Sequence, residues 1–371
     1  MTLSRLHRTL RHPYYVMAPD YTEASGGIQS LHYLCHALNL EGADAYLASA
    51  RHTQAGLKTP LLTDEILQRH VAAGLQPIAI YPEIVTGNPL GATVCVRYML
   101  NKEGLLNGNR TEAGPDDLHV YYRDEFRDPA RPGPLLRLPM IDVTLFSPEP
   151  VQPRTVDLLY LNRVPRSAVD FSTLPAGIQV LCLDDPLPLP ALADLLRRAR
   201  VFYSYEASGT CSLAVFCGCP VVARVAPGYE RYAITEQGVE DLGGGIAWHD
   251  DPASLQAALA QAGHARERYA QVETLFWQQL DIVIADTQQR ADRAEAAARR
   301  DPMATWLESR RFDAHQHARI AEYLQQHGGG PSLLVLVRDP GGDTDAVAAT
   351  LRSLDAAASP FRNLSAHVVG R

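Results

Sequence analysis

The segment YSYEASGTCSLAVFCGCPVV, residues 203–222, predicts the fold of the region around it. Its first residues complete the apolar run VFYSY (201–205), which is typical of a β-strand buried on both faces. Small polar residues then favour a helix from about Cys211 to Cys217, and a Gly-Cys-Pro sequence ends that helix before the next apolar run. Strand, helix and strand in succession are the repeating unit of a parallel α/β sheet.

The same alternation fills the N-terminal part of the chain. Residues 14–19 predict a buried strand, and apolar residues at helical spacing predict a helix over 28–38 that leads to a strand at 44–49. This is a βαβ unit, which requires a parallel sheet. Further strands are predicted at 76–84, 92–100 and 117–126. The proline-rich residues 127–153 lack periodicity, which is typical of a linker or an extended crossing.

After the proline-rich segment the pattern starts again. Strands are predicted at 156–163 and 177–185, a helix at 189–200, and one long helical pattern at 269–300. The predicted fold class is therefore α/β, with two Rossmann-like domains facing a cleft, then a helical linker and a partial α/β unit. The expected boundaries are 1–150, 151–290, 291–330 and 331–371.

Composition limits the classes of function. The chain has 371 residues, which favours two or more domains, and a formal net charge of −8, which argues against a nucleic-acid partner. The six cysteines mostly lie inside apolar runs, and no stretch approaches the roughly 18 apolar residues that a membrane span requires. With no signal peptide recognised, we expect reduced thiols in a cytoplasmic protein.

The end of the strand at 201–205 is a candidate ligand site. In an open parallel sheet, ligands bind beyond the carboxyl ends of the strands, and Glu206 falls at such an end. The small residues Ser208, Gly209 and Thr210 leave the first N–H groups of the next helix open to a phosphate. A nearby carboxylate can bind sugar hydroxyl groups, so the pair suits a nucleotide sugar. Alternatively, the helix is simply capped and Glu206 pairs with a neighbouring arginine.

These motifs resemble those of GT-B glycosyltransferases. The resemblance covers roughly residues 14–290 and rests on Ser25-Gly26-Gly27 after the first strand and on residues 205–222, which end in the family's G-x-P-V-V pattern. Residues 83–108 are similar to a segment of polysaccharide-assembly enzymes such as rhamnosyltransferases. In this family the nucleotide sugar lies between the two domains, and the second domain binds most of the nucleotide.

The resemblance implies roles for particular residues. Gly26 and Gly27 would let the backbone approach the donor diphosphate, and Arg163 would neutralise the leaving diphosphate. Glu206 would face the donor sugar. The remaining implied donor-binding residues are Arg166, Tyr205, Ser208, Gly209, Thr210, Cys211 and Ser212.

The chain departs from the family pattern at two positions. The second glutamate of the family falls near Leu213, in a motif one residue short, and the usual lysine after the arginine is replaced at best by Arg166. These losses leave the ribose contacts and the stereochemical outcome open. An inverting enzyme needs a general base, for which we name Asp20 as the catalytic candidate. The alternatives are Glu23, Glu83 and His119.

Metal and redox motifs are weaker. His32 and His36 lie one turn apart on a predicted helix, a spacing that can hold a metal, but a surface or domain-facing pair is favoured because the motif has no acidic partner nearby. Cys217 and Cys219 flank a helix-ending glycine beside buried valines, which favours packing. No metal site and no cofactor are expected, the nucleotide diphosphate-sugar being a co-substrate. Residues 331–371 resemble the opening βαβ unit of a GT-A domain, so we expect the chain to be the front of a longer polypeptide.

Together these features predict a metal-independent glycosyltransferase. It would move a hexosyl or deoxyhexosyl group to a hydroxyl of a bacterial surface glycan, such as lipopolysaccharide O-antigen. The expected partners are a nucleotide-sugar donor and a glycan or lipid-linked glycan acceptor, with peripheral contact to the inner membrane or to partner transferases. The rival predictions are a non-catalytic glycan-binding or scaffolding module, and a sugar-nucleotide epimerase of the same fold.

Overall fold

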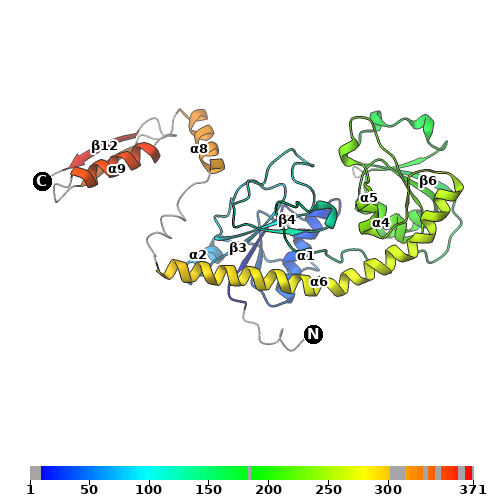
Figure 1. Ribbon diagram of the computed structural model, residues 1–371, viewed down its shortest axis with the longest axis horizontal. Coiled ribbons are helices and arrows are strands. Elements are labelled where there is room, and N and C mark those ends of the chain that lie inside the picture. Colours follow the sequence, from blue (N-terminus) through cyan, green and yellow to red (C-terminus); the bar gives the residue numbers. More distant parts are fainter. Residues whose placement is uncertain are drawn as a thin grey trace. The chain divides into compact units, whose positions relative to one another are not determined.

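The computed structural model describes residues 10–182, 185–300, 314–328, 333–338, 344–357 and 364–369. These residues form two five-stranded sheets and one two-stranded sheet (Figure 1), and every strand pairing is parallel. Contacts divide the chain into two units, of which the larger comprises residues 1–85 and 92–300 and holds both five-stranded sheets. The predicted α/β class is confirmed.

The first sheet has the strand order β2-β1-β3-β4-β5. Its strands are β1 (Tyr14–Met17), β2 (Ala45–Ala48), β3 (Ile78–Pro82), β4 (Val94–Met99) and β5 (Leu118–Tyr121). Helix α1 (Gly26–Leu40) connects β1 to β2, and α2 (Asp64–Ala72) precedes β3. From β1 the chain builds β2 on one side and β3 on the other. The sheet therefore changes direction between β1 and β3, which is the arrangement of a Rossmann-like domain.

The second sheet has the order β10-β9-β8-β6-β7. Its strands are β6 (Val156–Leu161), β7 (Gln179–Cys182), β8 (Ala199–Ser204), β9 (Val221–Ala223) and β10 (Ile246–Ala247). The helices among them are α3 (Leu189–Arg198), α4 (Gly209–Phe216) and α5 (Glu236–Leu242). Short 3₁₀ turns are η2 (Asp124–Phe126), η3 (Arg166–Ala168), η4 (Phe171–Thr173) and η5 (Glu230–Tyr232). Here the change of direction falls between β6 and β8.

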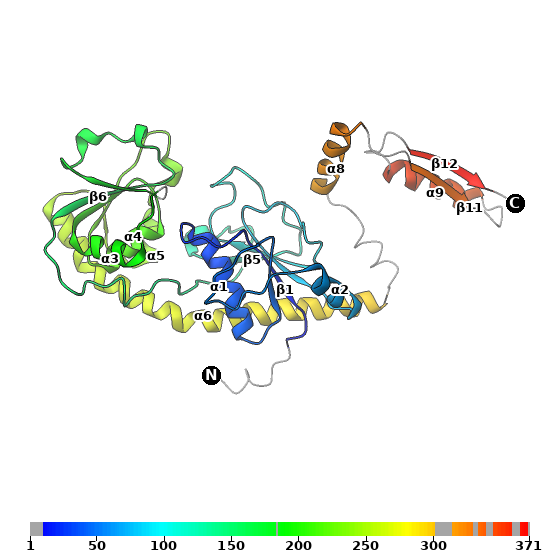
Figure 2. The same ribbon diagram turned by 180° about the vertical axis from the view of Figure 1, so that it is seen from behind.

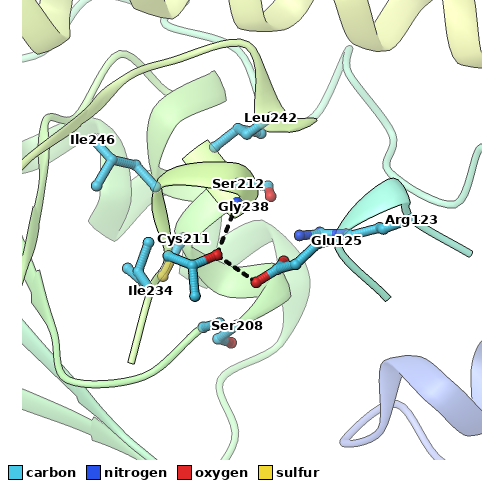
Figure 3. Close-up of a pocket in the computed structure, with 11 residues that line it drawn as sticks. Arg123, Glu125, Ser208, Cys211, Ser212, Ile234, Gly238, Leu242 and Ile246 are labelled. Carbon is cyan, nitrogen blue, oxygen red and sulfur yellow. Dashed lines mark hydrogen bonds between the residues drawn. The ribbon is translucent and has the colours of Figure 1, made fainter. Parts of the chain in front are cut away.

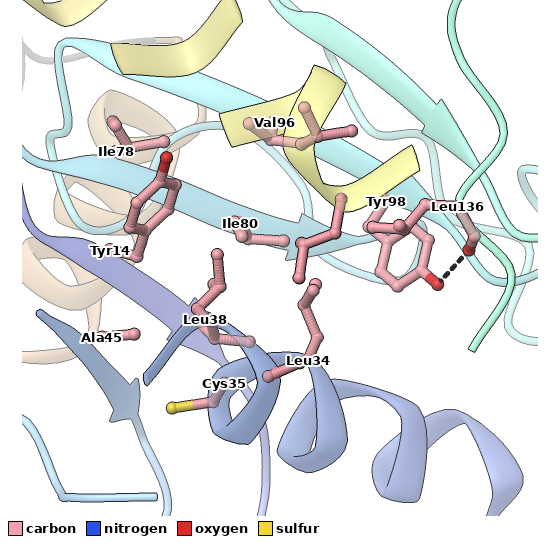
Figure 4. Packing of buried hydrophobic residues seen from close by; sticks show 14 of the residues in the cluster. Tyr14, Leu34, Cys35, Leu38, Ala45, Ile78, Ile80, Val96, Tyr98 and Leu136 are labelled. Carbon is pink, nitrogen blue, oxygen red and sulfur yellow. Dashed lines mark hydrogen bonds between the residues drawn. The ribbon is translucent and has the colours of Figure 1, made fainter. Parts of the chain in front are cut away.

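One long helix, α6 (Pro252–Arg300), contributes to the cores of both sheets. Tyr269 and Val272 pack in the core of the second sheet, whereas Phe276, Leu280 and Ile284 pack in the core of the first. Figure 4 shows the first core, in which α1 side chains meet those of β3 and β4. The long helical pattern predicted at 269–300 is part of this helix, which begins earlier, at Pro252.

The proline-rich segment is an extended crossing that is fastened to the edge of the first sheet. Apart from one isolated bridge, residues 127–155 form no helix or strand. The Tyr121 N–H donates to the Pro134 carbonyl at 2.9 Å, and the Leu136 N–H donates to the Tyr121 carbonyl at 2.8 Å. The Leu136 carbonyl also accepts from the Tyr98 hydroxyl at 2.6 Å (Figure 4). Because its apolar residues join both cores, this segment is structural rather than a free tether.

The second unit is described by itself. It contains α8 (Ala314–Gln326), β11 (Leu333–Arg338), α9 (Thr344–Ala357) and β12 (Leu364–Val369) (Figure 2). Strands β11 and β12 pair in parallel around α9, so the predicted βαβ unit is present. The helical expectation for residues 301–313 lies outside the described residues. Among the described helices, none has the length and apolar content to cross a bilayer.

Candidate functional site

The point where the second sheet changes direction gathers several predicted site residues. Strands β6 and β8 are neighbours, and their carboxyl ends lie at the same edge because they are parallel. Arg163 follows β6, whereas Glu206 and Ser208 follow β8. Open α/β sheets bind ligands at this crevice, outside the carboxyl ends of the strands. The strand-end argument from the sequence therefore placed these residues at the correct edge.

Glu206 is enclosed by the chain itself. Its side chain has no exposed surface, and the carboxylate accepts hydrogen bonds from the backbone N–H groups of Asn162 and Arg163, the latter at 3.0 Å. The Arg163 guanidinium lies 3.5 Å from the same carboxylate. These contacts satisfy two backbone donors where β6 ends. The structure thus gives Glu206 the partners of the alternative interpretation, an ion pair with a neighbouring arginine, and leaves no carboxylate surface exposed to a sugar.

The first turn of α4 presents small residues on its outer side. The Ser208 hydroxyl caps the helix by accepting from the Thr210 N–H at 3.2 Å. Gly209 is exposed, and a Cβ added there would meet nothing within 4 Å. Cys211 and Ser212, by contrast, are buried. A phosphate approaching this turn would therefore meet Ser208, Gly209 and Thr210, with the positive end of the helix dipole behind them.

A loop from the first sheet closes over this turn (Figure 3). Arg123 and Glu125, which follow β5, line a small cavity together with α4 and α5. The Glu125 carboxylate accepts from the Thr235 hydroxyl at 2.6 Å, and that hydroxyl accepts from the Gly238 N–H at 3.0 Å. The Glu125 N–H also donates to Asp241 at 3.0 Å. The cavity measures about 20 Å³, which is room for about one water molecule.

Two of the implied donor-binding residues lie elsewhere. Tyr205 is 5% exposed and belongs to a hydrophobic core, so its ring does not line the crevice surface. Arg166 is exposed, with its guanidinium stacked 4.5 Å from the centre of the Phe171 ring. Burial of Tyr205 was not visible from sequence, because a tyrosine at a strand end occurs in either setting.

The first sheet places Ser25, Gly26 and Gly27 at its own change of direction, after β1. The Ser25 hydroxyl accepts from the Ile28 N–H at 3.4 Å and caps α1. A Cβ added to Gly26 would meet nothing within 4 Å, and one added to Gly27 would meet nothing closer than 3.8 Å. Packing among the described residues therefore does not require glycine at either position.

The four candidate bases have different surroundings. Hydrogen bonds from the backbone of Arg51 and from the ring and backbone of His52 hold the pKa of Asp20 at about 2, which makes that carboxylate a weak base at neutral pH. Burial raises the pKa of Glu83, which accepts from the Leu100 N–H after β4. The hydrogen bonds of Asp20 therefore hold the loop at Arg51 and His52 in place.

His119 lies within β5, where burial lowers its pKa, and its buried Nε2 has no hydrogen-bond partner among the described residues. Glu23 is exposed in the loop before α1. His119 also forms a hydrogen bond with the backbone of Asp117, which raises its pKa against the larger effect of burial.

Each of the two histidines on α1 forms a hydrogen bond with a backbone group. His32 bonds through Nε2 to the Pro19 carbonyl at 2.9 Å, and His36 Nδ1 accepts from the Lys58 N–H at 2.8 Å. His32 is buried rather than on the surface, and its Nδ1 has no hydrogen-bond partner among the described residues. Cys217 and Cys219 are buried, and burial raises their pKa values to about 11 and about 12, which suits packed thiols.

One further cluster has the ligand types of a metal site. His12, Asp292 and Glu295 lie within reach of a single ion. His12 Nδ1, however, accepts from the Gln76 N–H at 3.1 Å, so the ring proton is on Nε2 and points to Asp292 at 3.1 Å. Glu295 is paired with Arg11. The hydrogen bonds of this cluster therefore connect the segment before β1 to α6.

Comparison with known proteins finds no matching family model and no matching curated protein. Among solved structures, the chain is similar to a glycosyltransferase from Rickettsia africae at 9% identity and a TM-score of 0.43, over 73% of this chain and 97% of that one. It is also similar to MurG of Acinetobacter baumannii (8% identity, TM-score 0.38, 75% and 99%). A third is WaaG, a glycosyltransferase involved in lipopolysaccharide biosynthesis (10%, 0.39, 74% and 99%). All three TM-scores are below 0.5, so the fold is assigned from the strand order described above and not from these similarities.

Proposed function

We propose that the chain is a GT-B type glycosyltransferase, which transfers a hexosyl or deoxyhexosyl group from a nucleoside diphosphate sugar to a hydroxyl of a glycan. One observation carries the proposal: Arg163 and the capped start of α4 flank the point where the second sheet changes direction. Both features favour negative charge, and this crevice is where open α/β sheets bind nucleotides.

The geometry suits stabilisation of a leaving diphosphate. The Arg163 side chain is 33% exposed, and Glu206 holds its backbone N–H and one side of its guanidinium. The remaining guanidinium donors are then available to phosphate oxygens as charge builds up on them. In this account Glu206 is a positioning residue that acts through Arg163. It no longer serves as the group that binds the donor sugar.

The η2 turn would regulate access to the site. Glu125 fastens η2 to Thr235 and Asp241, and the cavity beneath it is too small for a diphosphate. Donor binding would therefore displace η2, and its return would exclude water from the donor.

The finer parts of the proposal rest on the sequence motifs. The segment 83–108 favours a bacterial surface glycan, such as lipopolysaccharide O-antigen, as the acceptor. The proposed transfer needs no metal. The enzyme would work in the cytoplasm, at the inner membrane or beside partner transferases. The βαβ unit at β11–β12 would be a GT-A-like unit. The resemblance to polysaccharide-assembly enzymes supports these assignments.

A non-catalytic glycan-binding module is the second candidate. It is favoured by Leu213, which stands near the position of the family's second glutamate and packs against the core, and by the small cavity at α4. The sugar-nucleotide epimerase remains a third candidate of the same fold.

One assay separates the three candidates. The 371-residue chain would be incubated with UDP-, GDP- and dTDP-sugars, and the products would be followed by NMR. We expect slow release of a nucleoside diphosphate from one donor, because transferases without an acceptor transfer to water. An epimerase would instead yield an epimeric sugar nucleotide. A module would bind glycans and leave every donor unchanged, and either of these results would overturn the proposal.

Substitution of Gly26 by alanine should separate ligand approach from folding. The added methyl group meets open space and alanine is the better helix former, so the free energy of unfolding should stay equal or rise by up to about 1 kcal/mol. Donor affinity should fall about tenfold, corresponding to about 1.4 kcal/mol, because the methyl group would occupy the approach of the diphosphate. Titration calorimetry measures this change. Gly56→Ala, also in open space, is the matched control. If the two variants bind the donor with equal affinity, Gly26 does not contact the donor.

A further inference from the structure

A second cavity lies beside the junction of the two sheets, apart from α4. It measures about 390 Å³ and is lined by residues that follow β5, by the proline-rich segment, by Asp241 of α5 and by one face of α6. Ligand pockets for small molecules span about 300–1,000 Å³, so this cavity admits a ligand of sugar size. Its lining shares only Arg123 with the cavity at α4. It is therefore a separate candidate site.

The charged groups that line this cavity balance one another. The lining holds as many carboxylates as arginines, namely Asp124, Asp241 and Glu267 against Arg123, Arg137 and Arg268. A ligand with a net charge gains no advantage here, because groups of both signs surround it in equal number. Such a ligand would also lose part of the hydration of its charge on entering. The balance therefore favours a neutral ligand that uses hydrogen-bond donors and acceptors alike.

The inner wall is held in place by hydrogen bonds within the chain. The Arg137 N–H donates to the Gln279 side chain at 3.1 Å, and Arg137 Nη1 donates to the Asp241 carbonyl at 3.1 Å. The buried Asp241 carboxylate accepts from the Glu125 N–H at 3.0 Å and from the Gln237 side-chain amide at 3.3 Å. A ligand therefore does not have to order this wall, which lowers the free-energy cost of binding.

One face of α6 supplies polar groups without partners. Glu267, Gln271 and Leu275 follow one another at helical spacing and are exposed, so their side chains lie on the face that lines the cavity. Among the described residues, the Glu267 carboxylate and the Gln271 amide have no hydrogen-bond partner. They offer both acceptors and donors to a ligand. The apolar part of the lining comes from Leu275, Leu135 and Val272.

We propose that this cavity binds a neutral saccharide unit. A sugar hydroxyl both donates and accepts hydrogen bonds, so several hydroxyls on one ring can use the arginines, the carboxylates and the Gln271 amide together. The C–H face of a sugar ring is apolar and suits the leucine and valine side chains, as well as Tyr122, which also lines the cavity. The saccharide bound here is not the sugar that is transferred. The site stands whether or not the chain is a transferase.

The test measures sugar binding to the full 371-residue chain by titration calorimetry and saturation-transfer NMR. The neutral probes are the methyl glycosides of glucose, galactose, mannose and rhamnose, and the charged comparisons are glucuronate and protonated glucosamine. We expect at least one neutral glycoside to bind, and neither charged sugar to bind more tightly. If no neutral glycoside binds at millimolar concentration, or if a charged sugar binds about tenfold more tightly than every neutral one, the proposal is wrong.

Two matched double variants locate the site on α6. Glu267→Ala with Gln271→Ala removes the two exposed polar side chains that line the cavity, and alanine is a good helix former, so the helix is kept. Glu273→Ala with Gln278→Ala removes the same residue types from exposed positions of α6 outside the lining. We expect binding of the glycoside to weaken about tenfold in the first variant and to stay unchanged in the second. Equal affinities in the two variants would contradict the proposed site.

Arg163→Ala separates this site from the proposed donor site. It should keep the neutral glycoside while it loses the nucleoside diphosphate. Loss of the glycoside in Arg163→Ala, with retention in the Glu267→Ala and Gln271→Ala double variant, would place the saccharide at the donor site and overturn the second site, while leaving the proposed function intact. Retention of the glycoside at α6 with no donor bound would instead remove the proposed function alone.

Discussion

Replacing Glu206 with alanine is expected to lower the free energy of unfolding by about 2–5 kcal/mol, mainly because two backbone donors lose their acceptor beside a partly exposed Arg163. The variant would leave the N–H groups of Asn162 and Arg163 without their acceptor where β6 ends. Each buried donor without a partner costs about 1–3 kcal/mol. Urea denaturation followed by circular dichroism measures the change, and the loss should appear in the transition of the second sheet.

Two further variants make the Glu206 result interpretable. Glu240→Ala removes an exposed carboxylate from α5 and should change stability by less than about 0.5 kcal/mol. Glu206→Gln keeps the shape but turns an amide donor toward backbone donors, so it should also be destabilised. If Glu206→Ala were as stable as the wild type and lost only transfer activity, the carboxylate would serve the donor sugar, contrary to the present account.

Replacing Arg163 with alanine is expected to lower kcat about 100- to 1,000-fold, as found when one preorganised donor to a developing negative charge is removed. Stability should also fall, because the fully buried carboxylate of Glu206 keeps its two backbone N–H partners but loses its positive counter-charge, so kcat is compared at a temperature where both proteins are folded. Arg163→Lys should recover part of the rate, since an ammonium keeps the charge but not the planar fork. Release of the nucleoside diphosphate at saturating donor measures kcat.

Arg166→Ala is the matched control for Arg163. Its guanidinium is exposed and stacks on Phe171, so its removal should alter kcat by less than about threefold, within the range of a weak surface contact. Equal losses of rate in the two variants would indicate a general electrostatic effect of the loop after β6, and would contradict a specific contact of Arg163 with the leaving group.

Strands buried on both faces were predictable because they are continuous apolar runs, as in β2, β3 and β9. Strand β7 is only partly buried, and β10 has two residues. Helix α2 was missed because it is mostly polar and exposed, with His70 its only buried residue, so it carries no apolar stripe. Helix α5 was missed because Gly238 interrupts a short polar sequence. Both helices are set by their threonine caps and by tertiary contacts.

The candidate site was predictable where topology alone decides position. Arg163 and Ser208 follow strands, so the carboxyl edge of a parallel sheet collects them. The environment of Glu206 was not predictable, because burial and the direction of backbone N–H groups depend on the neighbouring strand. Arg123 was missed although it also follows a strand, since no motif marked its loop.

The most direct test of the account measures binding of UDP, GDP, dTDP and CMP to the wild type and to Arg163→Ala by thermal shift. A ligand at one hundred times its dissociation constant stabilises the folded chain by about 2.7 kcal/mol, a readily measured shift. The account predicts that one nucleoside diphosphate stabilises the wild type and loses most of its effect in Arg163→Ala. If no nucleotide stabilises the wild type at millimolar concentration, or if the variant responds as the wild type does, the proposed donor site is wrong.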